Sequence, residues 1–103
     1  MKEIFTALNN KAFDNRVRLG IMSMLMVNDW MDFTTIKEML DLSDGNLASH
    51  LKALEAELYV EYKKQFVGRK PQTTYSVTVL GRKAFVEHLD ALEALVRRMD
   101  KDH

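Results

Sequence analysis

Hydrophobic residues in the first part of the chain recur every three or four positions, which is the spacing of one face of an α-helix. Residues 2–8 predict a short amphipathic helix whose apolar side is formed by Ile4, Phe5 and Leu8. We expect Asp14 to cap a second helix. The apolar positions of that helix are Val17, Ile21, Met22 and Leu25.

Two further helices are predicted after the second one in the chain. Residues 30–33 are long enough only for a turn or a brief strand. Thr35 and Glu38 then have the spacing of a capping box, which predicts a third helix. After a tight turn, Ser43 is the expected N-cap of a fourth helix that runs to about Glu57.

The pattern changes from helix to strand in the second half of the chain. Residues 59–67 are rich in β-branched and aromatic residues, as strands are. Residues 68–72 have turn chemistry, because Gly68 tolerates a positive φ and Pro71 cannot donate to a strand ladder. The next segment, residues 73–79, alternates between an apolar and a polar face. Its apolar face is formed by Tyr75, Val77 and Val79, and its polar face by Thr74, Ser76 and Thr78.

Helical spacing returns over residues 80–98. The order helix, helix, short strand, helix, helix, strand, strand, helix is the layout of a winged helix-turn-helix. We therefore predict an α+β fold, mainly α, with a two- to three-stranded antiparallel wing sheet and a C-terminal dimerisation helix. We expect one domain over residues 1–103, with a winged-helix core at 10–80 and dimerisation helices at 1–9 and 81–99.

The composition is that of an ordinary globular protein, with 47% hydrophobic and 29% charged residues. There is no cysteine, which removes disulfide and thiolate metal sites. Residues 1–5 lack the apolar core of a signal peptide, and no segment has the roughly 18 apolar residues that a membrane span needs. We expect a cytoplasmic protein without a membrane partner.

The formal net charge is zero, but the charges are unevenly distributed. Residues 62–86 contain no acidic residue, which leads us to expect one positive face able to attract phosphates. The alternative is that lysines on an exposed hairpin discourage aggregation. The cations of this segment are Lys63, Lys64, Arg69, Lys70, Arg82 and Lys83.

The predicted helix after Ser43 has two contrasting faces. Its expected buried stripe consists of Leu47, Leu51, Leu54 and Leu58. The opposite arc is small and polar, with Gly45, Asn46, Ser49, Lys52, Ala53 and Ala56, and with His50 on its flank. Such a face suits the major groove, because Asn pairs with adenine and small residues let a helix lie deep. The DNA-contacting residues predicted on this helix are Ser43, Asn46, Ser49, His50 and Lys52.

Two alternatives remain open for this helix. The outer face can be an ordinary solvated face of an all-α domain. His50 can pack on the helix flank instead of touching DNA, and as a metal ligand or catalytic base it has no partner in the sequence.

The predicted hairpin supplies the second group of DNA-contacting residues. A basic loop on a rigid ribbon can lie along the phosphate backbone or insert an arginine into the minor groove. A solvated charged turn is the alternative. The predicted wing contacts are Lys63, Lys64, Arg69, Lys70 and Thr73.

The last helix has more apolar surface than a small monomer covers easily, which predicts a symmetric dimer. Packing within its own domain is the alternative. The predicted interface consists of Ile4, Phe5, Leu8, Phe85, Leu89, Leu92, Val96 and Met99. His88, Asp90 and Glu93 are a weak metal-site pattern that we interpret as solvated polar positions. We find no catalytic residues, cofactor motif or phosphate-binding glycine loop, so we predict no metal, no cofactor and no enzyme activity.

Several segments resemble the winged helix-turn-helix transcriptional regulators of the MarR/ArsR-like class, in its compact subgroup of about a hundred residues. They are residues 15–19, 42–61, 66–75 and 78–82. The resemblance implies a homodimer that binds pseudo-palindromic operators through the fourth helix and the wing. The sequence lacks the cysteine or clustered histidine ligands of the metal-sensing members, and it lacks the longer dimerisation region of the ligand-binding members. The predicted fourth helix, which would be the recognition helix, also has no arginine, the residue that most often contacts guanine in the major groove.

These observations together predict sequence-specific binding of double-stranded DNA by a homodimeric transcriptional regulator, a repressor in preference to an activator. The alternative is a winged-helix module that binds proteins and has no DNA-reading role. Nothing in the sequence identifies a small-molecule effector.

Overall fold

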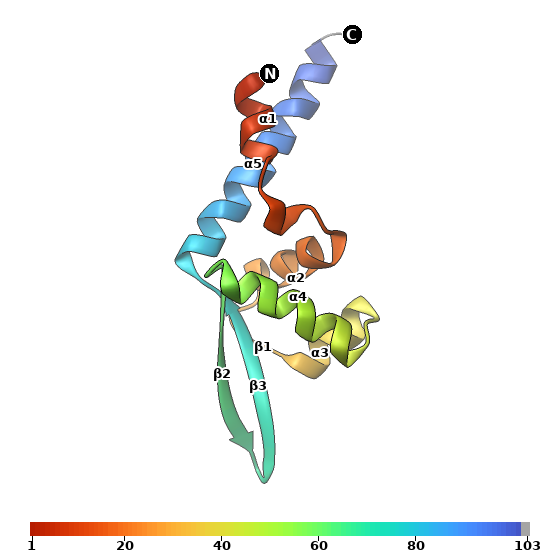
Figure 1. Cartoon of the computed structure of the whole chain (residues 1–103), viewed down its shortest axis with the longest axis vertical. Helices are drawn as coiled ribbons and strands as arrows, with labels where there is room; N and C mark the ends of the chain where they lie inside the picture. The colour runs from red at the N-terminus through yellow and green to blue at the C-terminus, as the bar shows by residue number, and fades with distance from the viewer. Residues whose placement is uncertain (102–103) are drawn as a thin grey trace.

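The computed structural model describes residues 1–101 and shows an elongated molecule of 59 × 25 × 21 Å. Its radius of gyration is 15.7 Å, larger than the about 13 Å expected for a compact chain of this length. Figure 1 shows the reason: a hairpin extends from one end of the helical body, and a long helix extends from the other. The elements are α1 (Lys2–Leu8), the 3-10 helix η1 (Lys11–Phe13), α2 (Arg16–Val27), β1 (Met31–Asp32), α3 (Phe33–Leu40), α4 (Asp44–Ala56), β2 (Val60–Val67), β3 (Lys70–Val77) and α5 (Val79–Lys101).

The sheet has three antiparallel strands in the order β1-β3-β2. The β2–β3 hairpin, which we call the wing, is paired from Val60 opposite Val77 to Val67 opposite Lys70. The brief β1 joins the other edge of β3, with Met31 opposite Tyr75. The prediction of a winged helix-turn-helix is therefore confirmed, and the brief strand expected within residues 30–33 is present as the third strand of the sheet.

The core lies where α2, α3 and α4 pack on the base of the sheet and on the start of α5. Aromatic rings close one side of it: Phe13 stacks on Tyr59 with ring centroids 5.5 Å apart and meets Phe85 edge-on at 5.4 Å. The most deeply buried side chains are Ile21, Met22, Leu25, Ile36, Leu47, Leu51 and Leu54.

Two helix starts differ from the predicted ones. The cap of α2 is Asn15, whose side chain accepts hydrogen bonds from the N–H groups of Val17 and Arg18 at 2.8 and 3.2 Å. Asp14 instead ends the 3-10 helix η1, a local element that periodicity does not reveal. The cap of α3 is Asp32, which accepts from both the N–H and the hydroxyl of Thr35. That hydroxyl bond holds the pKa of the Asp32 carboxyl below its ordinary value.

The turn of the wing is shorter than predicted. Strand β3 begins at Lys70, which leaves only Gly68 and Arg69 between the strands, and Gly68 has a φ of +65°. Pro71 therefore lies inside a strand, opposite Phe66. This is tolerated because β1 reaches only as far as Thr74, so β3 has a single neighbouring strand at Pro71.

The predicted apolar stripe of α4 ends at Leu54, and including Leu58 in it was wrong. Leu58 has a φ of +63° and its side chain is 67% exposed. The chain reverses direction here. The N–H of Tyr59 donates to the carbonyl of Leu54 at 3.0 Å, which is the hydrogen bond that closes a helix followed by a residue in the left-handed conformation. Glycine is the usual residue at such a position.

The end of β3 was also predicted incorrectly. Val79 is the first residue of α5 and is 89% exposed, whereas Thr74, expected on the polar face, is buried. The hydroxyl of Thr78 fixes the change of direction: it donates to the carbonyl of Leu58 at 2.6 Å and accepts from the N–H of Gly81 at 2.9 Å. The helix can pass this close only because residue 81 is glycine, since a Cβ there would lie 2.1 Å from the carbonyl oxygen of Tyr59.

Two residues of α5 belong to the core and not to the surface. Phe85 packs on Phe13 inside the domain, which removes it from the predicted dimer interface. His88, interpreted as a solvated position, is buried, with its ring 5.1 Å from that of Phe13. The helical spacing located the apolar face of α5 but did not show that the half nearer the wing is covered by η1.

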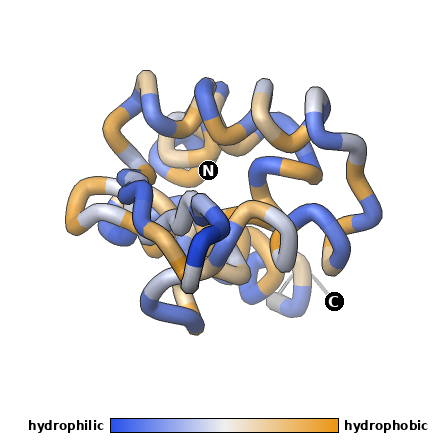
Figure 2. The backbone as a smooth tube through the Cα atoms, turned by 90° about the horizontal axis from the view of Figure 1, so that it is seen from below, coloured by the Kyte–Doolittle hydropathy of each residue, from blue (hydrophilic) through white to orange (hydrophobic). Residues whose placement is uncertain are grey.

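Hydrophobic and hydrophilic residues are interspersed along residues 1–101, and neither kind is confined to one part of the fold (Figure 2). Within residues 1–101, no helix combines the length and the apolar content that crossing a bilayer requires.

Candidate nucleic-acid interface

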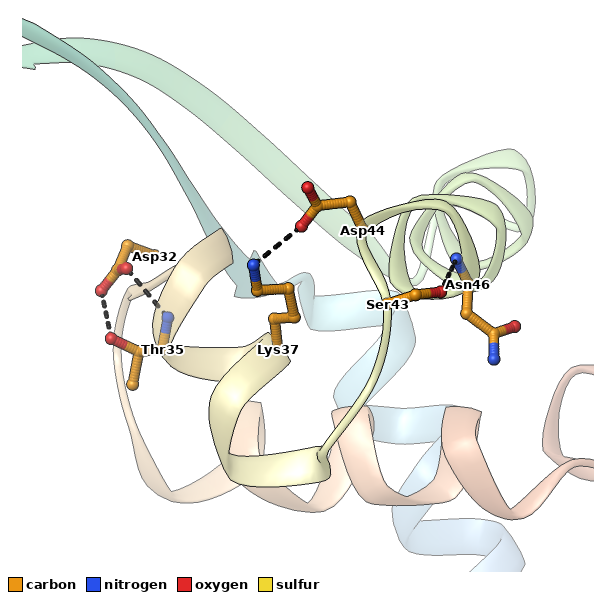
Figure 3. A network of polar contacts seen from close by, with 6 residues as sticks. All are labelled: Asp32, Thr35, Lys37, Ser43, Asp44 and Asn46. Atoms are coloured by element: carbon orange, nitrogen blue, oxygen red, sulfur yellow. Dashed lines mark hydrogen bonds and ion pairs between the residues drawn. The ribbon is translucent and has the colours of Figure 1, made fainter.

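The turn between α3 and α4 presents the start of α4 to solvent. Asp41 ends α3 in the left-handed conformation, and the hydroxyl of Ser43 accepts the N–H of Asn46 at 3.2 Å, as predicted for an N-cap. The ammonium of Lys37 lies 2.9 Å from the carboxylate of Asp44 and joins the two helices (Figure 3). These contacts fix the first turn of α4. In known helix-turn-helix proteins, the corresponding N-terminal residues of the recognition helix contact base edges.

The outer face of α4 is exposed and the inner face is buried, as the helical spacing indicates. Asn46, Ser49 and Lys52 are exposed, while Leu47, Leu51 and Leu54 lie in the core. Figure 3 shows the amide of Asn46 directed away from the Ser43 cap and from the Lys37–Asp44 pair. The Asn46 amide is thus available to an external partner, whereas the hydroxyl of Ser43 already serves the backbone.

His50 differs from its neighbours because it is half-buried on the flank of α4. Its Nδ1 lies 3.4 Å from Nη1 of Arg18, which comes from α2. Burial, and after it the positive charge of Arg18, lower the pKa of His50 below its ordinary 6.5. Sequence reasoning missed Arg18, because the two residues are 32 positions apart and only the packing of α2 on α4 brings them together.

The residues of the wing that are predicted to contact DNA lie at different positions along the hairpin and differ in exposure. Lys64, Arg69 and Lys70 are exposed, with Arg69 in the turn itself, and Thr73 is half-buried. Lys63 is turned towards Trp30, the residue before β1, and its ammonium lies 4.2 Å from the centre of the Trp30 ring. An exposed cation–π contact contributes about 0.5–1 kcal/mol, enough to favour this orientation without holding it rigidly.

An open groove separates the wing from the start of α3. It has a volume of about 670 Å³. Its lining includes Asp32, Phe33 and Thr34 on one side and Lys70, Gln72 and Thr73 on the other. The polar groups of the wing flank are therefore not covered by the domain itself.

The basic segment does not form the single positive face that we expected. Four of its six cations lie on the wing, but Arg82 and Lys83 lie in the first turns of α5. The eight residues of β3 span about 27 Å, so these two cations are more than a Debye length from the wing tip. The sequence showed the excess of charge, and the antiparallel hairpin determined where that charge lies.

The far end of α5 leaves apolar side chains uncovered. α1 lies alongside α5 at this end (Figure 1), with Ile4 and Leu8 half-buried. The predicted interface residues that remain exposed in the single chain are Phe5, Leu89, Leu92, Val96 and Met99. Within residues 1–101, no group of three His, Cys, Asp or Glu side chains could hold a metal ion.

Comparison with known proteins identifies the fold and its family. Residues 17–96 match the family described as the winged helix DNA-binding domain. The chain belongs to this family. This winged helix protein is 34% identical over 90 residues to an uncharacterised protein of Methanocaldococcus jannaschii, covering 87% of the present chain and 98% of the relative.

Solved structures agree with this assignment. A structure described as a transcriptional regulator homologue from Pyrococcus horikoshii OT3 superimposes with a TM-score of 0.88 at 32% identity, covering 97% of this winged helix protein and 99% of that chain. HlyU from Vibrio cholerae N16961 superimposes with a TM-score of 0.66 at 27% identity, over 88% and 92% of the two chains. The resemblance to compact winged helix-turn-helix regulators is confirmed.

Proposed function

We propose that the protein binds double-stranded DNA sequence-specifically as a homodimer and regulates transcription, as a repressor in preference to an activator. The observation that supports this most is the pairing of a small, polar, exposed face on α4 with an exposed basic wing. The similarity to a protein described as a transcriptional regulator homologue supports the regulatory role.

In this proposal α4 lies in the major groove. The exposed amide of Asn46 has the donor and acceptor pair that recognises adenine, and Ser49 and Lys52 follow on the same face. The free N–H groups at the start of the helix favour a nearby phosphate. The negative charge of Asp44 would repel this phosphate, but the ion pair with Lys37 partly neutralises that charge.

The wing supplies most of the affinity in this proposal. Lys64, Arg69 and Lys70 project into solvent on a hairpin long enough to reach beyond the groove that α4 occupies. Contacts between cations and phosphates release counterions, and they give affinity without sequence preference. The wing touches the backbone or the minor groove beside the α4 contact.

The dimer is supported by the uncovered apolar surface of α5 and α1. Leu89, Leu92, Val96 and Met99 follow one another at helical spacing, and each is between 39% and 56% exposed. A two-fold pair of such helices would bury them and set two copies of α4 at a fixed separation, as a pseudo-palindromic operator requires.

A salt titration tests the role of the wing. Duplexes are selected from a random-sequence library with the wild-type protein, and binding is measured by fluorescence anisotropy at several salt concentrations. We expect Arg69→Ala with Lys70→Ala to lower the log–log salt slope by about 2, since each phosphate contact contributes ~0.9. Affinity for selected and unrelated duplexes should fall by a similar factor.

The matched control is Arg82→Ala with Lys83→Ala. This pair removes the same charge from the same acid-free segment but at the opposite end of β3. If both pairs weaken binding equally, net charge governs affinity and the wing assignment is wrong.

The reading role of α4 is tested by Asn46→Ala. Loss of a bidentate base contact should cost about 1–3 kcal/mol on selected duplexes and little on unrelated ones. Equal weakening on both would refute base reading by Asn46. Run-off transcription from a promoter that overlaps the selected sequence then distinguishes repression from activation.

Sedimentation tests the dimer with Leu92→Asp, which should produce monomers and weaken operator binding far more than Lys83→Ala does. The exposed apolar surface of α5 also favours a second candidate function, association with a different protein. Absence of DNA binding by the wild type at low salt would favour that candidate over the proposed one.

A further inference from the structure

Arg18 contacts His50, a side chain on the helix that we propose faces DNA. A guanidinium group has N–H donors and no acceptor. Nη1 of Arg18 lies 3.4 Å from Nδ1 of His50, so this contact is a hydrogen bond only if Nδ1 is the acceptor. The single ring proton of a neutral His50 must then be on Nε2.

Arg18 is itself held firmly enough to impose this choice. Its Nε donates to the carbonyl of Ala12 at 2.7 Å, and its Nη2 donates to the carbonyl of Lys11 at 3.0 Å. The guanidinium therefore spans from η1 to α4. Two of its three nitrogens are engaged by carbonyls of η1, and the third, Nη1, is directed at Nδ1 of His50.

The charge on Arg18 also acts against the doubly protonated ring. An imidazolium would place a second positive charge, and a second donor, against the guanidinium. Burial and Arg18 both lower the pKa of His50, which favours the neutral ring. The side chain is half-buried and not enclosed by the domain.

We propose that Arg18 is a positioning residue that holds His50 in the tautomer protonated on Nε2, so that this N–H donates a hydrogen bond to the DNA. The inference rests on the proposed function, since it requires α4 to face a duplex. A fixed neutral donor recognises an acceptor: a phosphate oxygen, or a base-edge acceptor such as a purine N7, guanine O6 or thymine O4. It would also supply a donor on a helix that has no arginine.

Substitutions of His50 by glutamine and asparagine test which ring nitrogen donates a hydrogen bond to DNA. The amide nitrogen of glutamine approximates the position of Nε2, and that of asparagine approximates Nδ1. We expect His50→Gln to bind selected duplexes within about twofold of wild type. His50→Asn should bind them about threefold to tenfold more weakly, the loss of one net hydrogen bond.

Binding to a second, unrelated duplex shows whether the hydrogen-bond acceptor on the DNA is a base edge or a phosphate. If His50→Asn weakens binding to selected duplexes only, the acceptor is a base edge; if it weakens binding to unrelated duplexes equally, the acceptor is a phosphate. Either result supports the Nε2–H of His50 as a hydrogen-bond donor to DNA. Equal affinities of the Gln and Asn variants would overturn it.

Nitrogen-15 NMR of the ring at pH 7 tests the role of Arg18 without DNA. We expect the wild type to show a protonated Nε2 and an unprotonated Nδ1 at His50, with the signals assigned by their absence in His50→Gln. Arg18→Met should shift both nitrogens towards a mixture of tautomers. Arg16→Met, which removes the same charge from an exposed position of α2, should leave them unchanged.

The outcomes separate the inference from the proposed function. A wild type that binds no duplex at low salt refutes the proposed function, whatever the NMR shows. A wild type that binds DNA but carries its His50 proton on Nδ1 refutes only the inference.

Discussion

Helix α4 and strand β2 are neighbours in the chain but are stabilised in opposite ways. α4 buries Leu47, Leu51 and Leu54 almost completely, so tertiary packing fixes its place. Strand β2 has one buried residue, Val60, and seven exposed ones, so pairing with β3 is its main support. The two parts of the proposed DNA interface are therefore a rigidly mounted helix and a projecting arm.

This difference suits the two roles. Reading a base edge requires a side chain held to within a fraction of an ångström, which a packed helix provides. Following a phosphate backbone tolerates adjustment, which an exposed hairpin permits. The substitutions below test the contrast through the free energy of unfolding, measured by urea denaturation at one fixed protein concentration.

The largest effect is expected from the inner face of α4. Leu51→Ala should lower the free energy of unfolding by about 2–5 kcal/mol, because it leaves a cavity in the core. Phe66→Ala on the wing removes a larger side chain that is 74% exposed, and it should change stability by less than about 0.5 kcal/mol. Similar losses from both would show that the wing is packed in solution.

The second test concerns the joint where the wing meets α5. Gly81→Ala should cost about 1–3 kcal/mol, because its Cβ would overlap the carbonyl of Tyr59. Gly45→Ala in α4 meets no atom within 4 Å and should stabilise the helix by about 0.4–1 kcal/mol. If Gly81→Ala is neutral, α5 can move away from the sheet without loss.

A smaller effect is expected at the start of α4. Ser43→Ala removes the acceptor for the N–H of Asn46 and should cost about 1 kcal/mol. Ser49→Ala, on the exposed face, should cost less than half of that. Amide hydrogen exchange should show faster exchange at Asn46 in the Ser43 variant, and an unchanged rate there would mean that the cap does not hold the first turn.

The smallest effect is expected at Leu58, where α4 ends. Leu58→Gly should raise stability by less than about 1 kcal/mol, because glycine adopts a φ of +63° without steric cost but has more freedom when unfolded. Leu58→Ala keeps the steric cost and should bring no gain. A loss of stability in the glycine variant would show that the exposed leucine side chain makes a stabilising contact in the assembled protein.

Local patterns predicted most of the fold. Ser43 as an N-cap, the inner leucines of α4 and the two strands of the wing all depend on residues within a few positions of one another. The helix starts at Asn15 and Asp32 were missed because several polar residues near each start could cap a helix. Only the path of the backbone decides which of them does.

The candidate site was predicted less completely than the fold. The outer face of α4 could be derived from helical spacing, and the wing cations from the acid-free segment. The partners of His50 and Lys63 could not, because Arg18 and Trp30 lie about 30 positions earlier in the chain. The burial of Phe85 and His88 likewise depends on η1 folding back over α5.

The sequence by itself determined the α-helices and strands, their order and the small polar face of α4, but not the 3-10 helix η1, because periodicity acts over several turns of chain and η1 has only three residues. The tertiary structure decided which ends of the molecule stay uncovered, where the positive charge lies and which ring nitrogen of His50 faces Arg18. Those properties depend on distances between side chains that are remote in the chain, and such distances exist only after the helices have packed.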